Sequence, residues 1–380
     1  MVPMSERTED RIQAGAGTPG GTPMDAYDYG LPESAIAQYP VEPRSAARLL
    51  IGPGLRPGAG PGPGHATVAD LPTLLRPGDV LVVNDTRVLP ARLSLRKQSG
   101  GSAEVLLLEP VDTRAGLWEA LVRPGRRLPS PTPLYEPDAA ADAPPVVEVG
   151  AVLGGADDGR RCVRVLDPSV VERAGSMPLP PYIHRALDDP ERYQTVYSAH
   201  RSLGDRSTAA PTAGLHFTPD LLAACVDAGA TLARVDLAIG LDTFRPVTAP
   251  TAEEHVIHTE RYTVPEETMA ACAAGRRVVA VGTTVVRALE SAAATGRLEG
   301  RTDLYIHGAY PFRVVDVLVT NFHLPRSSLL LLVEAFCGPL WRQLYATALA
   351  EGYRFLSFGD AMVVGRSPAA PAGDGTVTGW

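Results

Sequence analysis

Two hydrophobic patterns divide this chain near Gly175, and they constrain its fold more than any other feature. Before that point, short alternating or apolar segments follow one another at close spacing, separated by turn residues. The expected strands are Val80–Val83, Ala103–Leu108, Trp118–Val122, Val146–Val152 and Cys162–Leu166. Closely spaced strands without intervening helices are typical of a small barrel or sandwich. The pattern therefore predicts a β-rich insert that is either a small barrel or a sandwich.

After Gly175, strand-like and helical segments alternate, which is typical of a layered α/β domain. The expected strands are Leu232–Ile239, Val278–Val281 and Val314–Val319, and the expected helices are Pro219–Ala228, Glu266–Ala274, Thr284–Ala294, Ser327–Phe336 and Leu340–Ala350. We therefore expect an α/β fold in which residues 25–75 and 176–366 form a discontinuous catalytic domain. Residues 76–175 are the expected barrel insert, and residues 1–24 and 367–380 are expected to be disordered tails.

The charge and cysteine content exclude several classes of protein. A net charge of −8 gives no overall positive field that would attract nucleic acid or an anionic membrane, so RNA contact requires a local basic patch. The four cysteines lie far apart without a CxxC pair, which predicts neither a zinc knuckle nor a disulfide framework. The longest strongly apolar segment, Leu329–Val333, is too short to span a bilayer, and we see no signal peptide. We expect a cytoplasmic protein.

A local basic patch could come from arginines of the predicted barrel, although ordinary solvated surface explains them equally well. These arginines are residues 92, 96, 123, 126, 127, 160, 161 and 164.

Polar residues follow several predicted strands, where ligands of α/β sheets usually bind. In one such segment the strand Val278–Val281 runs into Gly282, followed by Thr283 and Thr284, which could cap the next helix. Arg287 follows one turn later, so the junction could bind a carboxylate. An ordinary helix cap with a solvated arginine is the alternative.

The segment Thr320–Pro325 offers Asn321 and His323 to the same crevice. A neutral histidine there could serve as an acid or base near pH 7, or it could be a structural residue in a turn. Ahead of the Pro219 helix, Ala209–Phe217 has small residues that permit close backbone approach to a ligand. A further polar turn, Val83–Arg87, is equally consistent with a plain Asx-turn.

Two other clusters have less specific patterns. His255 and His258 are three residues apart, but a third ligand is missing from the surrounding sequence, so we expect no metal. Tyr182, Tyr193 and Tyr197 could stack on a purine or pack between domains.

Taken literally, the sequences of these segments identify a family. LPESAIAQYP (31–40), GDVLVVNDTR (78–87), PLPPYI (178–183), YQTVY (193–197), AAPTAGLHF (209–217), AVGTT (280–284), VTNFHLP (319–325) and YRFLSFGDAM (353–362) occur in this order. Together they closely resemble the S-adenosylmethionine:tRNA ribosyltransferase-isomerase family over about residues 25–365.

The resemblance implies an α/β domain with an inserted β-barrel and an enzyme that uses S-adenosylmethionine as a substrate. The family transfers the ribosyl part of S-adenosylmethionine to the aminomethyl group of 7-aminomethyl-7-deazaguanine in tRNA. The sugar rearranges to the epoxycyclopentanediol of epoxyqueuosine, and adenine and methionine leave. This chemistry requires no metal or redox cofactor. We expect a monomer or weak homo-oligomer that does not bind membranes.

The resemblance also suggests roles for the junction residues. His216 or His323 is expected to transfer protons, and Asp85 or Asp360 to hold polar groups. Arg87 or Arg287 is expected to bind the methionine carboxylate. The remaining residues expected to bind substrate or S-adenosylmethionine are Thr212, Gly214, Thr283, Thr284, Asn321, Tyr182 and Asp242.

Three departures from the family pattern concern the expected substrate region. Where the family reads TLHVGAGTF, this chain has Asp236–Phe244, so that Ala238 replaces a histidine and Leu241-Asp242 replaces Ala-Gly. Where the family has a Pro-Gly-Tyr turn, this chain has His307-Gly308-Ala309, and the segment 202–208 also differs from the family pattern. Two alternatives therefore remain open: a homologue with a small-molecule acceptor in specialised metabolism, or a non-catalytic protein that binds S-adenosylmethionine or RNA.

Overall fold

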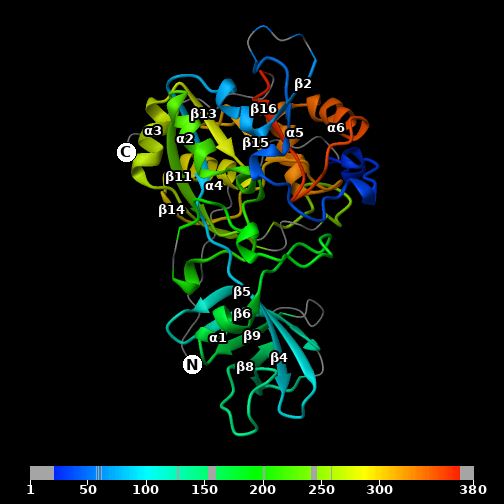
Figure 1. Ribbon diagram of the computed structural model, residues 1–380, viewed down its shortest axis with the longest axis vertical. Helices are drawn as coiled ribbons and strands as arrows, with labels where there is room; N and C mark the ends of the chain where they lie inside the picture. The colour runs from blue at the N-terminus through cyan, green and yellow to red at the C-terminus, as the bar shows by residue number, and fades with distance from the viewer. Residues whose placement is uncertain are drawn as a thin grey trace.

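The computed structural model describes residues 21–56, 58, 60, 62–125, 128–152, 160–199, 202–240, 246–257 and 259–368. Figure 1 shows two lobes along the long axis, each built around one β-sheet. Most of the two expected tails, residues 1–20 and 369–380, lies outside the described residues. The first tail was expected to reach Met24, and this was wrong: Met24 is buried and its backbone N–H donates to Pro250 O at 3.0 Å.

The larger sheet has nine strands within the described residues, and its central four are parallel. Antiparallel strands extend this parallel centre at both edges. In spatial order the strands are β14 (Glu299–Thr302), β12 (Glu260–Thr263), β11 (Thr231–Leu237), β3 (Asp79–Asn84), β13 (Arg277–Val281), β15 (Val317–Asn321), β16 (Ala361–Gly365), β1 (Arg48–Ile51) and β2 (Gly64–Thr67).

Helices cover both faces of this sheet, which confirms the predicted layered α/β fold (Figure 1). Along β3, Val80 and Val82 belong to the buried cluster that includes residues of α3, α4, α5 and α6, whereas Leu81 and Val83 belong to the cluster that includes residues of α2. A strand buried on both faces reads as a continuous apolar run, as β3 does. The helices are α1 (Ser169–Ala174), α2 (Pro219–Asp227), α3 (Glu266–Ala274), α4 (Thr283–Thr295), α5 (Ser328–Cys337) and α6 (Leu340–Ala350).

Short 3-10 helices fill many of the connections. Those in the described residues are η1 (Met24–Tyr27), η2 (Glu33–Ala35), η3 (Arg44–Ala46), η4 (Val68–Leu74), η6 (Pro190–Tyr193), η7 (Leu203–Asp205) and η8 (Thr212–His216).

The smaller sheet closes into an antiparallel barrel of six strands, because β4 pairs with both β5 and β7. Its strands alternate between buried and less buried residues, as the sequence pattern predicts, and the buried ones form a separate core. In spatial order the strands are β10 (Gly175–Ser176), β4 (Arg92–Lys97), β5 (Ser102–Asp112), β6 (Leu117–Arg123), β9 (Arg160–Val165), β8 (Val147–Val152) and β7 (Thr132–Tyr135).

The start of the insert differs from the prediction. The range 76–175 placed Val80–Val83 in the barrel, but β3 lies between β11 and β13 at the centre of the larger sheet. The strands of the barrel begin at β4, and the chain returns to the larger sheet at β11. The prediction was wrong at this point because the spacing of strands along the chain does not reveal which strands pair.

Candidate functional site

The four parallel strands end at one edge of the larger sheet, and the polar junction segments meet there. Six of the residues predicted to form the site line one narrow crevice at this edge: Tyr182, Thr212, Thr283, Thr284, Asn321 and His323. The crevice has a volume of about 40 Å³, which is room for little more than one water molecule. These six residues, which are up to 141 positions apart in the chain, therefore lie together in the folded protein.

Hydrogen bonds hold the crevice walls to one another. The Thr212 hydroxyl donates to Asn321 Oδ1 at 2.9 Å, and the Asn321 amide donates to Leu356 O at 3.2 Å. Tyr182 Oη lies 2.8 Å from Ser357 Oγ. Because these groups are held in place by neighbours from three different segments, the polar atoms of the crevice are preorganised.

His323 follows β15 and lies in the crevice wall. Its Nε2 is 3.0 Å from Thr320 Oγ1, and its backbone N–H donates to Tyr345 Oη at 2.9 Å. Burial lowers the pKa of the imidazole from its ordinary value to about 3. The ring is therefore neutral at pH 7, with one nitrogen that can donate and one that can accept.

The N-terminus of α4 forms another wall of the crevice. Gly282 has φ 95°, a backbone conformation that favours glycine, and it turns the chain from β13 into the helix. The two threonines were expected to cap this helix, which was wrong, because Gly282 is the cap residue and no side-chain cap hydrogen bond forms. Thr284 Oγ1 instead accepts from the Asn84 amide at 3.3 Å, which ties α4 to the end of β3.

The crevice does not include three of the predicted site residues: His216, Asp360 and Gly214. His216 is buried, and its two ring nitrogens face Ala213 O at 3.2 Å and Gly359 O at 2.9 Å. Burial lowers its pKa. Asp360 accepts backbone N–H groups with both carboxylate oxygens, from Arg48 at 2.9 Å and from Arg354 at 2.8 Å.

Gly214 has a packing role. A Cβ atom at this position would lie 2.0 Å from Tyr197 Oη, so the glycine is required for the contact between η8 and this tyrosine. The predicted small-residue loop therefore packs closely against protein here, rather than against the crevice.

Two further predicted residues, Arg87 and Asp85, follow β3. The Arg87 guanidinium pairs with Glu191 at 2.5 Å and donates to Ser198 at 3.2 Å. Asp85 is buried, and its backbone continues the sheet by donating to Val235 O at 2.9 Å. Neither residue lines the crevice.

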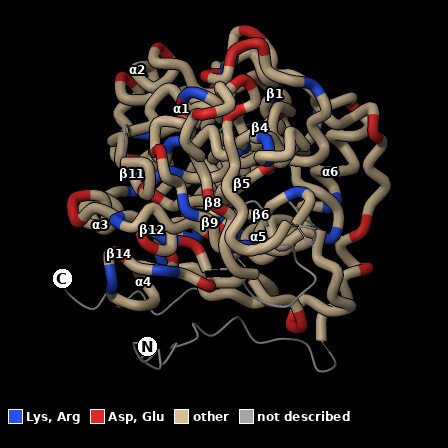
Figure 2. Tube along the Cα trace, turned by 90° about the horizontal axis from the view of Figure 1, so that it is seen from below, with Lys and Arg blue, Asp and Glu red and all other residues tan. Residues whose placement is uncertain are grey.

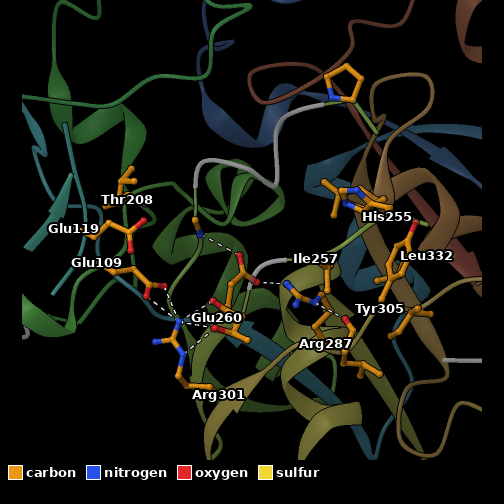
Figure 3. Close-up of a pocket in the computed structure, with 18 of the residues that line it drawn as sticks. Glu109, Glu119, Thr208, His255, Ile257, Glu260, Arg287, Arg301, Tyr305 and Leu332 are labelled. Atoms are coloured by element: carbon orange, nitrogen blue, oxygen red, sulfur yellow. Dashed lines mark hydrogen bonds and ion pairs between the residues drawn. The ribbon is translucent and has the colours of Figure 1, made fainter. Parts of the chain in front are cut away.

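A much larger cavity of about 430 Å³ opens between the barrel and the larger sheet (Figure 3). The crevice and the cavity share Leu329 in their walls. The barrel contributes Leu108, Glu109, Glu119 and Arg160, and the charged or polar residues from the larger lobe are Thr208, Thr248, His255, Thr259, Glu260, Arg287, Arg301, Tyr305 and Ser328.

Arg287 connects α4 to this cavity and is buried with a carboxylate. Its Nη1 pairs with Glu260 of β12, and its Nε donates to Leu304 O at 3.0 Å. Glu260 also accepts from the Gly240 backbone N–H at 3.0 Å (Figure 3). Arg287 Nη2 has no hydrogen-bond partner among the described residues. A buried guanidinium nitrogen without a partner can bind a ligand that offers an acceptor.

Two partly exposed ion pairs line the other side of the cavity. Arg301 pairs with Glu109 at 2.8 Å and also donates to Thr259, while Arg160 pairs with Glu119 at 2.5 Å. The cavity wall thus carries three arginine–glutamate pairs, in contrast to the uncharged crevice. Figure 3 shows Glu109 and Glu119 on the opposite side of the cavity from Arg287 and Tyr305.

Most of these cavity residues were missed by sequence reasoning, with Arg287 as the exception. Glu109 and Glu119 appear in the sequence as ordinary polar positions of alternating strands. His255 was noticed as half of a possible metal pair, and it lines the cavity. A residue pattern does not show that a barrel strand and a distant strand face one another across a cavity.

One departure from the family pattern, at His307, lies next to this cavity. Leu241, Asp242 and His258 lie outside the described residues. His307 is buried, and burial lowers its pKa. Its ring lies 4.7 Å from that of Tyr305, a residue of the cavity wall.

The arginines considered as an RNA patch are largely engaged within the barrel. Arg92 pairs with Glu104 at 2.9 Å, and Arg160 pairs with Glu119. Arg161 is buried and donates to backbone carbonyls. The two arginines at 126 and 127 lie outside the described residues. Figure 2 shows basic and acidic positions interspersed along the described chain, rather than separated into halves.

Two properties of the described residues concern metal binding and membrane insertion. Among these residues, no group of three or more His, Cys, Asp or Glu side chains is arranged to hold a metal ion. Within the same part of the chain, no helix has the length and apolar character needed to cross a membrane.

Comparison with known proteins identifies similar chains over nearly the whole length. A family model described as queuosine biosynthesis protein matches residues 24–364. A protein of Rubrobacter xylanophilus, named S-adenosylmethionine:tRNA ribosyltransferase-isomerase, is 49% identical over 342 residues, covering 90% of this chain and 97% of that protein. A protein of the same name from Thermus thermophilus is 49% identical over 359 residues, with 90% and 99% covered.

A solved structure is also similar. The crystal structure of an S-adenosylmethionine tRNA ribosyltransferase from Thermotoga maritima is 35% identical, with a TM-score of 0.48, and the match covers 89% of this chain and 99% of that one.

Proposed function

This chain belongs to the queuosine biosynthesis protein family, and on that premise we propose that it is an S-adenosylmethionine:tRNA ribosyltransferase-isomerase. It transfers the ribosyl part of S-adenosylmethionine to 7-aminomethyl-7-deazaguanine in tRNA and rearranges it to the epoxyqueuosine side chain. Adenine and methionine are released. The observation that carries this proposal is the 49% identity to proteins of that name over almost their full length.

The reaction makes clear demands on the protein. The sulfonium acidifies the C5′ hydrogens, so a positioned base can remove one of them. The bond from C5′ to sulfur breaks with its electron pair on sulfur, which leaves methionine, and adenine leaves more easily when a ring nitrogen is protonated or hydrogen-bonded. The acceptor amine must be neutral when its nitrogen bonds to the sugar.

We assign the donor to the crevice and the adjoining cavity. A volume of about 430 Å³ is within the range of pockets that hold drug-sized ligands, while the crevice alone holds no more than a small group. Thr283, Thr284 and Arg287 lie within the first two turns of α4, so one molecule can contact both spaces. The unpartnered Nη2 of Arg287 is the proposed ligand of the methionine carboxylate.

His323 is the better supported candidate for proton transfer. It lines the crevice and is neutral at pH 7, and because its lowered pKa makes it a weak base, it is suited to donate a hydrogen bond to a substrate nitrogen. His216 is held between two backbone carbonyls, and its role in catalysis rests on the family motif alone. Asp85, Asp360 and Arg87 have protein partners, and we propose that they support the surrounding segments.

We further propose that the enzyme acts in the cytoplasm on tRNA, as a monomer or weak homo-oligomer. The extensive match to tRNA-modifying relatives does not favour a small-molecule acceptor or a non-catalytic role.

Product analysis tests the proposal. S-Adenosylmethionine is incubated with the protein and tRNA that carries 7-aminomethyl-7-deazaguanine, and with unmodified tRNA as the control. Release of adenine and methionine only with the modified tRNA supports the proposal. S-Adenosylhomocysteine would show methyl transfer, and release driven equally well by a free amine without tRNA would show a small-molecule acceptor; either result contradicts it.

A further inference from the structure

Two glutamates of the barrel face the large cavity side by side. Glu109 of β5 and Glu119 of β6 are direct cross-strand partners, and both line the cavity (Figure 3). The register of the two strands shifts between Leu107 and Glu109. Such irregularities re-aim side chains and are common beside functional sites. Here the irregularity lies immediately before the cross-strand pair of Glu109 and Glu119.

This arrangement is unfavourable without a cation. Like charges directly opposite each other on adjacent strands repel, so each glutamate needs compensation. Arg301 and Arg160 supply it at 2.8 and 2.5 Å. The side chains of these two pairs are between 23% and 44% exposed, and ion pairs in contact with water are weak and exchangeable. A carboxylate has enough lone pairs to accept a further donor while it keeps its arginine.

Two buried polar atoms show that the same cavity is built to hold a polar ligand. Arg287 Nη2 and Tyr305 Oη both belong to residues that line it, and neither has a partner among the described residues. Arg287 is 5% exposed and Tyr305 is 8% exposed. Buried polar groups are normally hydrogen-bonded, so these two atoms can form hydrogen bonds with a polar ligand. The cavity therefore has one end with two buried polar atoms that can bind a ligand, and a barrel end with two carboxylates in partly exposed ion pairs.

We propose that Glu109 and Glu119 recognise the protonated aminomethyl group of the acceptor base, so that the barrel determines acceptor specificity. One of the two carboxylates accepts the ammonium proton before the neutral nitrogen bonds to the sugar. This inference rests on the proposed function. An alkyl amine is mostly protonated near pH 7, as a lysine side chain is. The unmodified guanine of tRNA has no such cation. A pair of carboxylates opposite the donor end of the cavity thus distinguishes the modified base from the unmodified one by charge.

A comparison of two acceptors isolates this charge. The dissociation constants of the protein are measured for tRNA that carries 7-aminomethyl-7-deazaguanine and for tRNA that carries 7-cyano-7-deazaguanine, whose nitrile is uncharged at the same ring position. The unsubstituted protein should prefer the aminomethyl form. In Glu109→Gln, Glu119→Gln and the double variant, this preference should fall by about 10-fold to 100-fold, the range of a charge-assisted hydrogen bond.

Glu104→Gln is the matched control. Glu104 also lies on β5 and pairs with an arginine, Arg92, at 2.9 Å, but it does not line the cavity. This variant should keep the full preference for the aminomethyl form. The affinity of Glu104→Gln for S-adenosylmethionine alone should remain within about 2-fold of the unsubstituted protein. Urea unfolding of every variant shows whether it is folded.

The result separates the two proposals. If the unsubstituted protein releases adenine and methionine with the aminomethyl tRNA, but the double variant retains the preference over the nitrile, the role of the glutamates is overturned while the function stands. An equal loss of preference in Glu104→Gln would also overturn it, because the effect would then be a general one of barrel charge. Failure of the unsubstituted protein to release adenine would contradict the proposed function itself.

Discussion

The crevice at the strand ends and the cavity between the two lobes differ in how their walls are made. The crevice has a volume of about 40 Å³ and is lined by residues that come from recognisable junction segments. The cavity has a volume of about 430 Å³ and is lined by residues from strands of the barrel and from β12, β14 and α4. Local sequence thus locates polar groups at strand ends, while the space for a substrate arises where separately folded layers meet.

The two spaces also differ in charge. The polar side chains that line the crevice are threonine, serine, asparagine, tyrosine and a neutral histidine, whereas three arginine–glutamate pairs line the cavity. An uncharged crevice of this size suits a small polar group of a substrate, and a cavity rich in ion pairs suits the charged ends of the substrates. Substitutions in the crevice and in the cavity test this division of roles.

The largest expected effect is on the cavity side. Arg287→Ala should lower the free energy of unfolding by about 3–5 kcal/mol, because it leaves Glu260 buried without its cation. It should also abolish measurable binding of S-adenosylmethionine. Urea unfolding and calorimetric titration measure the two effects.

Arg301→Ala is the companion variant. Its ion pair with Glu109 is partly exposed, so the unfolding free energy should change by no more than about 1 kcal/mol. Equal losses in both arginine variants would contradict the distinction between a buried and an exposed pair in this cavity.

The next largest effect concerns the two histidines. His323→Ala should lower kcat by about 10²-fold, the usual contribution of an acid or base, because His323 lines the crevice. His216→Ala should lower stability more than turnover, since it removes a side chain that contacts two backbone carbonyls. Single-turnover kinetics and urea unfolding of both variants provide the measurement. Full activity in His323→Ala would leave the crevice without its proposed proton-transfer group.

The smallest effect is on the pH dependence of stability. His323 has a pKa of about 3 in the folded protein, against about 6.5 when unfolded, so the unfolded state binds a proton between these values and the folded state does not. Stability therefore falls as the pH falls below about 6.5, and this histidine should account for up to about 2 kcal/mol between pH 6.5 and pH 5. His216 acts in the same direction, because its pKa is also lowered.

Urea unfolding at pH 7 and pH 5 tests this dependence. The loss of stability on acidification should be smaller in His323→Gln than in the unsubstituted protein. His184→Gln, which removes an exposed histidine, is the control. Identical losses in His323→Gln and the unsubstituted protein would show that His323 is accessible to protons in the folded state.

The sequence alone determined the kinds of elements and the residues that meet at the strand ends. The range Glu266–Ala274 was predicted and is α3. Residues from three of the four polar junctions line one crevice, and β13 and β15, which precede two of them, are parallel strands that end at one edge of their sheet. Hydrophobic periodicity reports which residues are buried within a few turns or strands, and this is a local property.

The tertiary structure decided which of these elements and side chains are partners. The apolar run of β3 shows that the strand is buried on both faces, but only its pairing with β11 and β13 places it at the centre of the larger sheet rather than in the barrel. Likewise, Arg287 could have been solvated or bound to a carboxylate, and it is buried against Glu260, 27 residues away. Whether a residue is buried can be inferred from the pattern of its own short segment. Which segments pair cannot be inferred in this way, because their separation in the chain does not indicate that they are in contact.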